Sequence, residues 1–560
     1  MVAMKVLSAA EMQACDRATT EKFGVPSLVL MRNAAAAVAA FAREQFPRAR
    51  RVTMLCGRGN NGGDGMMAAR LFAASGLEVT TVLLGSPAGL KGDAADAWRE
   101  LTNTAHGLIH VIDKPEELAQ YNRALETDLI VDAVLGTGFE PPLRGLAHAA
   151  LDWMKASKAP VLAVDLPSGW PADETNPTVD GPVFPADAVV TFTAPKPAHV
   201  FGQLTRRWDQ PIVVTPIGSP EAAIVSSLGV EWGGTAHALV QAPRAATANK
   251  GSFGHVLVVG GSFGSSGGKS GAPSMAALAA LRVGAGLVTA AVPAPALPVV
   301  AAITPELMTW SLASTASGQI AEENLAPAKL NAFTAGKTVL ALGPGLGQSP
   351  DTTKFTMGLL SATRMPAVID ADALNILASK PAHLEKLAGF TKAGRVMVLT
   401  PHPGEMGRLA GITTAEVQAD RLKVAREFAQ RFGVTLVLKG WRTLIAHPDG
   451  RVAVNTTGNP GMAKGGSGDL LTGLVAGILA QYPDEPARAV EAAVYLHGLA
   501  ADLAVRKVDE HTLLATDCLA QLSRAFRFRA LRFYSGGRNG YVWLQGLPEF
   551  PATGSDEARE

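Results

Sequence analysis

The sequence has little cysteine and no excess of charge of either sign. Its 560 residues include 3 cysteines, Cys15, Cys56 and Cys518, and none of them belongs to a CxxC pair. We therefore expect neither a disulfide framework nor a zinc cluster, and a reducing cytoplasm suits the chain. The 50 basic residues nearly cancel the 49 acidic ones. Because a net charge of +1 creates no global field for a polyanion, nucleic acid is not an expected partner.

Long uninterrupted apolar runs are also lacking. Gly, Pro or Arg282 breaks the longest ones, and Glu11 and Asp16 precede any apolar stretch near the N-terminus. A membrane-spanning helix needs roughly 20 apolar residues, and a signal peptide needs an apolar segment after its basic start. We therefore expect no membrane span, no signal peptide and no membrane partner.

The composition that is present predicts a folded chain of several domains. Hydrophobic residues make up 48% and charged residues 18%, which is not the signature of disorder. A length of 560 residues exceeds what one hydrophobic core usually serves. The 58 glycines gather at a few junctions between apolar runs and helical stretches, a pattern typical of proteins that hold phosphates.

Two successive series of short apolar runs predict two doubly wound α/β domains with parallel sheets. The first series comprises residues 52–56, 79–84, 129–135, 161–166, 188–192 and 212–215, and the second comprises residues 255–259, 287–292, 338–342, 367–370, 395–400 and 436–439. Helical patterns are expected at residues 28–46, 420–432, 469–481 and 487–506, and Ser8 with Glu11 forms a capping box for an earlier helix. We predict a Rossmann-like domain over residues 1–220, a linker over 221–239, a second α/β domain over 240–526 and an extension over 527–560. The Arg-bearing, Gly-rich extension is expected to be solvated, with a partner-binding role as the alternative.

The first glycine-rich loop follows the run at 52–56 and reads GRGNNGGDG (57–65). It satisfies GxGxxG, but the acidic residue that would hold a ribose after the next strand is missing, because Leu84, Gly85 and Ser86 stand there. Two amides and a carboxylate in this loop can instead grip a phosphate, an amide or a small cation at a helix N-terminus. The structural alternative is a tight turn.

Two further loops, DAVLGTGFEPPLRG (132–145) and DLPSGW (165–170), also follow apolar runs. Open α/β sheets place their ligands at the carboxyl ends of strands, so Asp165 is expected to point into the crevice with Ser168 nearby. Either Asp alone could be a helix cap, but three such loops in order favour a shared site.

GxGNNGGDG, DAVLGTG and DLPSG, in this order, resemble the NAD(P)H-hydrate epimerase family over about residues 5–220. Members interconvert the R and S forms of NAD(P)HX, the nicotinamide cofactor hydrated at C6. The resemblance implies that Asp165 is the acid/base group and also contacts substrate, and that a potassium ion is held by Asn61, Asp132 and Ser168. It implies substrate contacts at Asn60, Asn61, Gly62, Gly63, Asp64, Gly136, Thr137, Gly138, Phe139, Glu140, Pro141 and Pro142. The segment LMRNAA (30–35) departs from the pattern of this family, because Arg32 stands where the family has an acidic residue.

The second half carries its own glycine-rich loops. Gly268, Lys269 and Ser270 imitate the end of a P-loop, but Phe263 stands where the first glycine of GxxxxGK[ST] belongs. In GGSGD (465–469), consecutive amides can face one anion, with Asp469 beside them at a helix N-terminus. An anion hole next to a carboxylate base is what the phosphorylation of a hydroxyl requires. A plain helix start is the structural alternative.

GGSGD with KGWRT resembles the ribokinase-like fold. Together with NKGSFGHVLVVGGS, LGPGLG, PHPGE and GNPGMAKGGSGD, it resembles the ADP- or ATP-dependent NAD(P)HX dehydratases over about residues 240–526. The resemblance implies a mechanism in which Asp469 deprotonates the C6 hydroxyl, the nucleotide phosphorylates it, Mg²⁺ bridges the phosphates and phosphate then leaves. It implies substrate contacts at Ala272, Gly345, Gly347, His402 and Asp469, and nucleotide contacts at Lys439, Gly440, Trp441, Arg442, Thr443 and Gly468. Structural alternatives are a loop histidine for His402 and a surface lysine for Lys439.

Both halves together predict a bifunctional repair enzyme that epimerises NADHX and NADPHX and dehydrates the S form. We expect K⁺, Mg²⁺ and ADP or ATP as cofactors or co-substrates, and a homo-oligomer. Which nucleotide is preferred stays open. The alternative is a ribokinase-like kinase of vitamin alcohols whose N-terminal domain only binds a ligand or serves as a scaffold. The long loop SSGGKSGAP (265–273) departs from the dehydratase pattern near Ala272.

Overall fold

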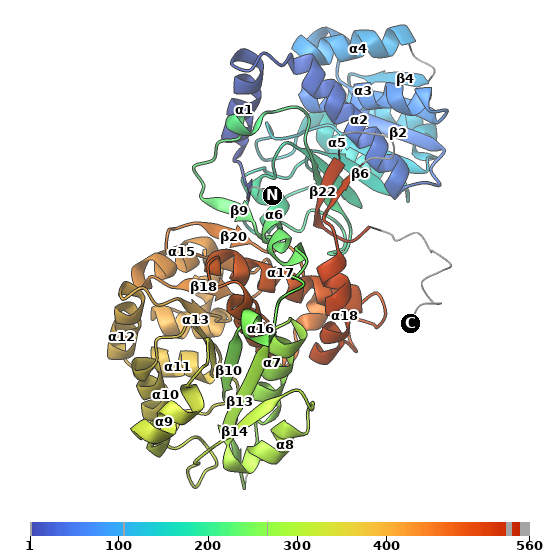
Figure 1. Ribbon diagram of the computed structural model, residues 1–560. Helices are drawn as coiled ribbons and strands as arrows, with labels where there is room; N and C mark the ends of the chain where they lie inside the picture. Colours follow the sequence, from blue (N-terminus) through green and yellow to red (C-terminus); the bar gives the residue numbers. More distant parts are fainter. Residues whose placement is uncertain (1–2, 105–106, 266, 534–539, 549–560) are drawn as a thin grey trace. The chain divides into compact units, whose positions relative to one another are not determined.

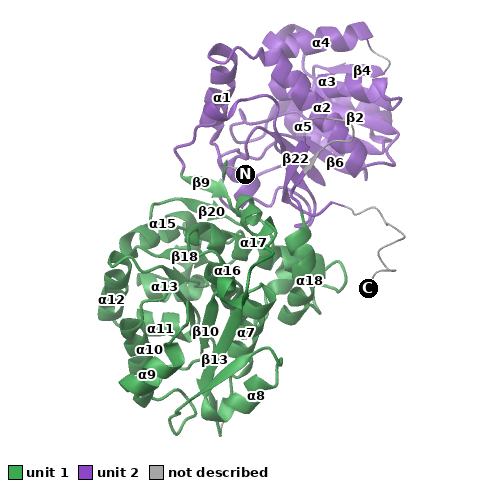
Figure 2. Cartoon of the chain, viewed as in Figure 1, with its two compact units in different colours: residues 1–4, 229–528 green, residues 5–228, 529–560 purple. Residues whose placement is uncertain are grey.

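A computed structural model describes residues 3–104, 107–265, 267–533 and 540–548 (Figure 1). The chain divides into two compact units (Figure 2). The N-terminal unit comprises residues 5–228 and 529–560, and the C-terminal unit comprises residues 1–4 and 229–528. Each unit contains a largely parallel sheet with helices, so the predicted α/β fold class is confirmed.

The sheet of the N-terminal unit has the order β21-β22-β8-β7-β6-β5-β2-β3-β4. Its strands β2 to β8 are parallel, and the chain starts in the middle and runs outward in both directions. The switch point therefore lies between β2 and β5. The strands are β2 (Arg51–Cys56), β3 (Glu78–Leu84), β4 (Leu108–Ile112), β5 (Leu129–Ala133), β6 (Val161–Val164), β7 (Ala188–Phe192), β8 (Ile212–Thr215), β21 (Leu531–Phe533) and β22 (Gly540–Gln545).

Both faces of this sheet are buried, as the continuous apolar runs predict. Successive side chains of a strand point to opposite faces, and Met54 and Leu55 accordingly belong to two different apolar clusters. One cluster packs against α2 and α3, and the other packs against α5. The helices are α1 (Ala9–Glu21), α2 (Ser27–Gln45), α3 (Asn60–Ala74), α4 (Gly92–Thr104), α5 (Gly145–Met154) and α6 (Pro197–Phe201). The predicted Ser8–Glu11 capping box begins α1.

The sheet of the C-terminal unit has the order β1-β9-β20-β19-β18-β17-β16-β15-β10-β13-β14. Strands β10 and β13 to β18 are parallel, while β19 pairs antiparallel with both of its neighbours. Successive strands are added in one direction from β10 and in the other direction from β15, so the switch point of this sheet lies between these two strands. The strands are β1 (Met4–Lys5), β9 (Val230–Trp232), β10 (His255–Val259), β13 (Leu287–Pro293), β14 (Met308–Leu312), β15 (Val339–Leu342), β16 (Ala367–Ile369), β17 (Met397–Leu399), β18 (Thr435–Leu438), β19 (Leu444–Ala446) and β20 (Val452–Val454), besides a small hairpin of β11 (Phe263–Gly264) and β12 (Gly267–Gly268).

Glycine lets two central helices of this unit approach closely. A methyl group on Gly473 of α16 would lie 2.0 Å from the carbonyl oxygen of Ala276 in α7, so only glycine fits there. The helices are α7 (Gly271–Arg282), α8 (Leu297–Ala301), α9 (Pro327–Thr334), α10 (Pro350–Ala362), α11 (Asp372–Ala378), α12 (Pro381–Lys392), α13 (Pro403–Ala410), α14 (Thr414–Ala419), α15 (Arg421–Phe432), α16 (Ser467–Gln481), α17 (Pro486–Ala504) and α18 (Ala515–Arg527). No helix among the described residues is long and apolar enough to cross a membrane.

Two segments differ from the sequence expectations. Part of the expected linker forms β9, which pairs with β20, because Val230 and Trp232 are buried there and the Trp232 indole donates to Thr456 at 2.8 Å. Part of the expected solvated extension forms β22, which pairs antiparallel with β8. Its Tyr541 and Trp543 are buried against Phe41 of α2. Val542 and Leu544, which alternate with them, are buried as well, so both faces of this strand are covered.

Two candidate active sites

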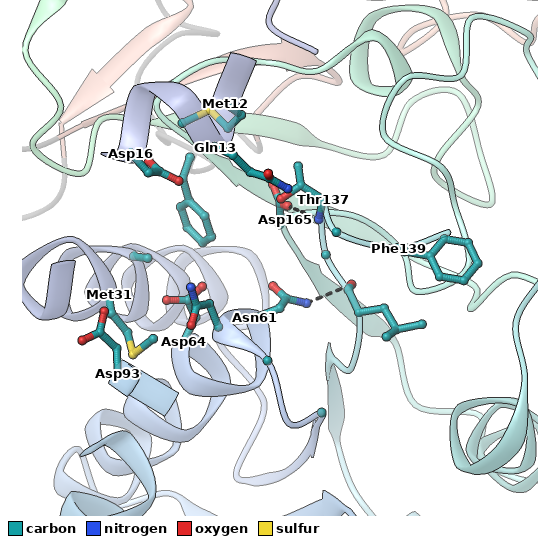
Figure 3. Close-up of a pocket in the computed structure, with 18 of the residues that line it drawn as sticks. Met12, Gln13, Asp16, Met31, Asn61, Asp64, Asp93, Thr137, Phe139 and Asp165 are labelled. Atoms are coloured by element: carbon teal, nitrogen blue, oxygen red, sulfur yellow. Dashed lines mark hydrogen bonds between the residues drawn. The ribbon is translucent and has the colours of Figure 1, made fainter. Parts of the chain in front are cut away.

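A cavity of about 1130 Å³ lies at the switch point of the N-terminal sheet (Figure 3). The loops after β2, β5 and β6 line it, as the position of ligand sites in open α/β sheets leads us to expect. Side chains of α1 and α2, including Met12 and Met31, close it from another side. The three loops singled out in the sequence therefore share one site.

Asp165 is the most strongly held carboxylate of this cavity. It has a φ of 66°, a conformation that a non-glycine residue rarely adopts. Its Oδ1 accepts the hydroxyl of Thr191 at 2.8 Å and the ammonium of Lys196 at 2.7 Å, and its Oδ2 accepts the amide of Thr137 at 3.1 Å. Burial opposes ionisation, but the charge of Lys196 and these hydrogen bonds outweigh it, so the pKa of Asp165 lies below its ordinary value.

Lys196 and His199 are site residues that the sequence analysis did not select. The ammonium of Lys196 is buried, and the His199 ring bonds the carbonyl oxygen of Asp165 at 2.7 Å. Burial and the Lys196 charge lower the pKa of His199 to about 4, so its ring is neutral at physiological pH. The signal in the sequence was a lysine four residues after the end of a buried strand, in FTAPKPAHVF (192–201).

Asn61, Asp132 and Ser168 form one connected polar group. The Ser168 hydroxyl and amide donate to Asp132 at 2.6 Å and 2.8 Å, and the Asn61 amide donates to the carbonyl oxygen of Leu135 at 2.9 Å. Burial raises the pKa of Asp132 to about 6, although the Ser168 bonds lower it. The Oδ1 atom of Asn61 is buried and accepts no hydrogen bond from the described residues. Oxygen donors with an unsatisfied buried atom fit a hard cation such as K⁺.

The predicted substrate residues of this unit divide into two groups. The residues that line the cavity are Asn60, Asn61, Asp64, Gly136, Thr137, Gly138, Phe139 and Asp165. The others are Gly62, Gly63, Glu140, Pro141 and Pro142, of which the last three are exposed. A methyl group on Gly62 would lie 1.9 Å from the Gly57 carbonyl oxygen, so this glycine allows the loop to pack tightly below the cavity.

A second cavity, of about 470 Å³, lies at the switch point of the C-terminal sheet. Loops after β10, β15 and β16 line it, together with the start of α16. Its lining includes the predicted residues Ala272, Gly345 and Asp469, and also Asp372 and Glu405. Ala272 lines this cavity despite the long loop before it.

Asp469 lies in the first turn of α16. This helix begins after Gly466, whose φ of 95° is in the left-handed region that favours glycine. Burial and the charge of Asp370 raise the pKa of Asp469 to about 6, while Lys439 and Lys269 lower it. The carboxylate is thus ionised at neutral pH and is a stronger base than an ordinary aspartate.

The half-buried Lys439 and the buried Asp370 form an ion pair beside this helix. The Lys439 ammonium lies 2.9 Å from Asp370 Oδ1 and 3.8 Å from Glu405 Oε2, and the Thr472 hydroxyl donates to Asp370 Oδ2 at 2.7 Å. A methyl group on Gly468 would lie 3.4 Å from the same ammonium. Lys439 is therefore not a surface lysine, and Asp370 and Glu405 are further site residues that sequence reasoning did not assign.

The remaining predicted residues serve local structure in varied ways. The His402 ring caps α13 by accepting the amide of Gly404 at 3.1 Å, and the Arg442 guanidinium is buried and donates to Thr456 at 2.9 Å. The Gly347 amide donates to Asp372 at 2.9 Å. Gly440, Trp441 and Thr443 belong to the turn between β18 and β19, outside the cavity lining.

The fold and the two sites define an enzyme of two α/β domains, each with a carboxylate-bearing cavity at the switch point of its sheet. Comparison with known proteins gives the family. Residues 256–524 match the family model described as NAD(P)H-hydrate dehydratase, and residues 27–198 match the model described as YjeF-related protein N-terminus.

The most similar relatives match along nearly the whole chain. The bifunctional NAD(P)H-hydrate repair enzyme Nnr of Moorella thermoacetica is 40% identical over 94% of this chain and 97% of its own length. The enzyme of the same name from Escherichia coli is 36% identical over 91% of both chains. A solved ADP/ATP-dependent NAD(P)H-hydrate dehydratase from Bacillus subtilis, co-crystallised with ATP and Mg²⁺, is 32% identical, with a TM-score of 0.43 over 52% of this chain and 96% of that chain. This chain belongs to the family of bifunctional NAD(P)H-hydrate repair enzymes.

Proposed function

We propose that each unit carries out one step of the repair of hydrated NADH and NADPH. The N-terminal unit interconverts R- and S-NAD(P)HX, and the C-terminal unit dehydrates the S form at the expense of ADP or ATP. The observation that carries this assignment is the pair of carboxylate-bearing cavities, one in each family-matched unit.

Asp165 is the acid/base group that we assign to the epimerisation. Its lowered pKa keeps it ionised at neutral pH, so it can accept a proton from the substrate hydroxyl. Asn60, Asp64 and the loop from Gly136 to Phe139 line the same cavity and are placed to contact the substrate.

Potassium is the cation we propose for Asn61, Asp132 and Ser168. The buried Asn61 Oδ1 and the buried Asp132 carboxylate offer oxygen ligands, and a cation would balance the carboxylate charge that burial disfavours. When bound, K⁺ would fix the loops after β2, β5 and β6, which carry the substrate contacts. Its role is thus to hold the cavity wall in place.

For the dehydration, we assign Asp469 as the base that removes the C6 hydroxyl proton. The hydroxyl oxygen then accepts the terminal phosphoryl group of the nucleotide. Phosphate leaves with the electron pair of the C6–O bond and takes the proton lost from C5, so the C5–C6 double bond of the ring returns. The amides at the start of α16 can stabilise the transferring anion, because a helix N-terminus carries partial positive charge.

We propose that Lys439 and Gly468 receive the nucleotide phosphates together with the turn from Gly440 to Thr443. Gly468 supports this because it leaves space beside the Lys439 ammonium. Asp372 and Glu405, which line the cavity with Asp469, provide oxygen ligands of the kind that Mg²⁺ prefers. The described residues contain no group of three or more His, Cys, Asp or Glu that could hold a metal, so phosphate oxygens would complete the coordination. Association with copies of the same chain and a cytoplasmic location stay predictions.

Two variants test the division of labour. Asp469→Asn should abolish recovery of NADH from S-NADHX and leave epimerisation intact, because the N-terminal carboxylates are untouched. Asp165→Asn should leave recovery from S-NADHX intact and remove enzymatic recovery from R-NADHX. Loss of both activities in either variant, with the fold preserved, would contradict two separate sites.

A further inference from the structure

Asp16 is a second carboxyl of the N-terminal cavity that neither the motifs nor the proposed mechanism uses. It lies on α1 and lines the cavity together with Asp165 and Asp64 (Figure 3). Its Oδ1 atom is buried and accepts no hydrogen bond from any described residue. A buried carboxyl oxygen without a partner is costly, so its presence at a ligand cavity points to use there.

The surroundings of Asp16 raise its affinity for a proton. Apolar side chains such as Met12, Leu30 and Met31 also line the cavity. Burial and the Asp165 charge raise the pKa of Asp16 to about 6, whereas Lys196 lowers it. The other titratable or charged groups that line the cavity are Arg17, Glu21, Arg58, Asp64, Asp93, Arg144, Asp165 and Lys196, and Cys15 is the neighbour of Asp16 in the chain. One cavity thus holds an ionised Asp165 and a more readily protonated Asp16, a separation of carboxyl roles that acid/base enzymes use.

We propose that Asp16 is the second proton-transfer residue of the epimerisation and exchanges a proton with the ring nitrogen of the hydrated nicotinamide. This inference rests on the proposed function of the N-terminal unit. Asp165 takes the C6 hydroxyl proton, the C6–N1 bond breaks with its electron pair moving to N1, and N1 takes the proton of Asp16 as C6 becomes an aldehyde.

Closure of the nicotinamide ring reverses these proton transfers, and it takes place on the opposite face of the aldehyde. Rotation about the C5–C6 bond presents the opposite face of the aldehyde to N1. N1 then attacks C6 and returns its proton to Asp16, while the new alkoxide takes the proton held by Asp165. The carbon is inverted, both carboxyls regain their starting protonation states, and no outside reactant is needed.

Asp64 is the competing carboxyl, and it differs from Asp16 in how firmly it holds its proton. Burial together with the Asp165 and Asp16 charges raises the pKa of Asp64 well above its ordinary value. A group that holds its proton so firmly is a hydrogen-bond donor to the substrate, whereas proton exchange is fastest for a group whose pKa is near the working pH. Asp16 meets that condition.

The test is the epimerisation of R-NADHX by the full chain with Asp16→Asn, followed over pH. We expect kcat to fall by about 10² or more with KM nearly unchanged, since general acid catalysis contributes about that factor. The wild-type rate should decline on the alkaline side as Asp16 loses its proton, and this decline should vanish from the residual activity of the variant. Asp180→Asn, at an exposed position outside the cavity lining, serves as the matched control and should keep the wild-type profile.

Two further readouts separate the possible outcomes. Recovery from S-NADHX reports that the variant is folded. Where Asp16→Asn does not fold, Asp16→Glu replaces it and should keep the alkaline decline at a reduced rate. A raised KM with unchanged kcat, or an Asp16→Asn profile shaped like the wild type, overturns the proposal. A wild-type protein without any epimerase activity overturns the proposed function instead.

Discussion

The ammonium of Lys196 lies 2.7 Å from Oδ1 of Asp165, and both side chains are buried at the floor of the N-terminal cavity. Neither charge would be stable there alone, because burial of an unpaired charge is strongly unfavourable. The pair therefore fixes an ionised carboxylate at the point where the epimerisation needs a base.

Replacing this lysine should move the pH dependence of epimerisation. In Lys196→Met the carboxyl of Asp165 remains buried without its cation, so its pKa rises and a larger fraction of the base is protonated at neutral pH. We expect the epimerase rate at neutral pH to fall at least about tenfold and the acidic limb of its pH profile to move to higher pH. Loss of one partner of a buried pair should also cost about 3–5 kcal/mol of stability. An acidic limb at the wild-type position in the rate profile would contradict this role.

The dehydratase should lose activity on acidification. Asp469 acts as a base, and its pKa is about 6, so kcat/KM for S-NADHX should decline below that pH as the carboxyl gains a proton. Because the folded state raises this pKa from 3.8, the group favours folding at low pH, and that contribution is lost as the pH rises through about 6. The unfolding free energy of the wild type, relative to that of Asp469→Asn, should therefore fall as the pH rises through about 6. A dehydratase rate independent of pH down to 4.5 would exclude Asp469 as the base.

Potassium should stabilise the N-terminal unit. A cation bound only by the folded state at about 100 times its Kd adds about 2.7 kcal/mol. We expect the thermal midpoint of this unit to rise with added KCl more than with choline chloride, and we expect the difference to disappear in Asp132→Asn. Equal midpoints in both salts for the wild type would argue against the site at Asn61, Asp132 and Ser168.

The final strand should be needed for the stability of the N-terminal unit. Trp543 is 3% exposed and packs on Phe41, so Trp543→Ala should lower the unfolding free energy of this unit by about 3–5 kcal/mol. Leu108→Ala is the matched control, because Leu108 is 63% exposed on β4 of the same sheet. Recovery from S-NADHX should be unchanged in both variants. Equal stability of the two variants would mean that β22 adds little to the fold.

Much of the fold was predictable from the sequence, because buried parallel strands read as continuous apolar runs. The runs at 52–56 and 255–259 coincide with β2 and β10. Segments whose partners are distant in sequence were not predictable. β22 has a clear strand composition, but only its pairing with β8, over 320 residues earlier, distinguishes it from a solvated tail. β9 was hidden among Gly and Ser for the same reason.

The sites were predictable where a motif places residues on one loop. Asp165 and Asp469 each belong to a recognisable glycine-bearing motif, and both line cavities. Lys196, Asp370 and Asp16 come from other elements, and their relevance depends on contacts that only the fold creates. The geometry also shows that Gly62 supports packing and that the Arg442 guanidinium is bonded within the fold.

The most direct test of two coupled repair steps in one chain is the recovery of NADH absorbance from a mixture of R- and S-NADHX. The purified protein is incubated with KCl, MgCl₂ and either ADP or ATP. We predict complete recovery of both epimers with at least one nucleotide, at a rate for the R fraction above its spontaneous epimerisation. No recovery with either nucleotide, or recovery of the R fraction only at the spontaneous rate, would contradict the account.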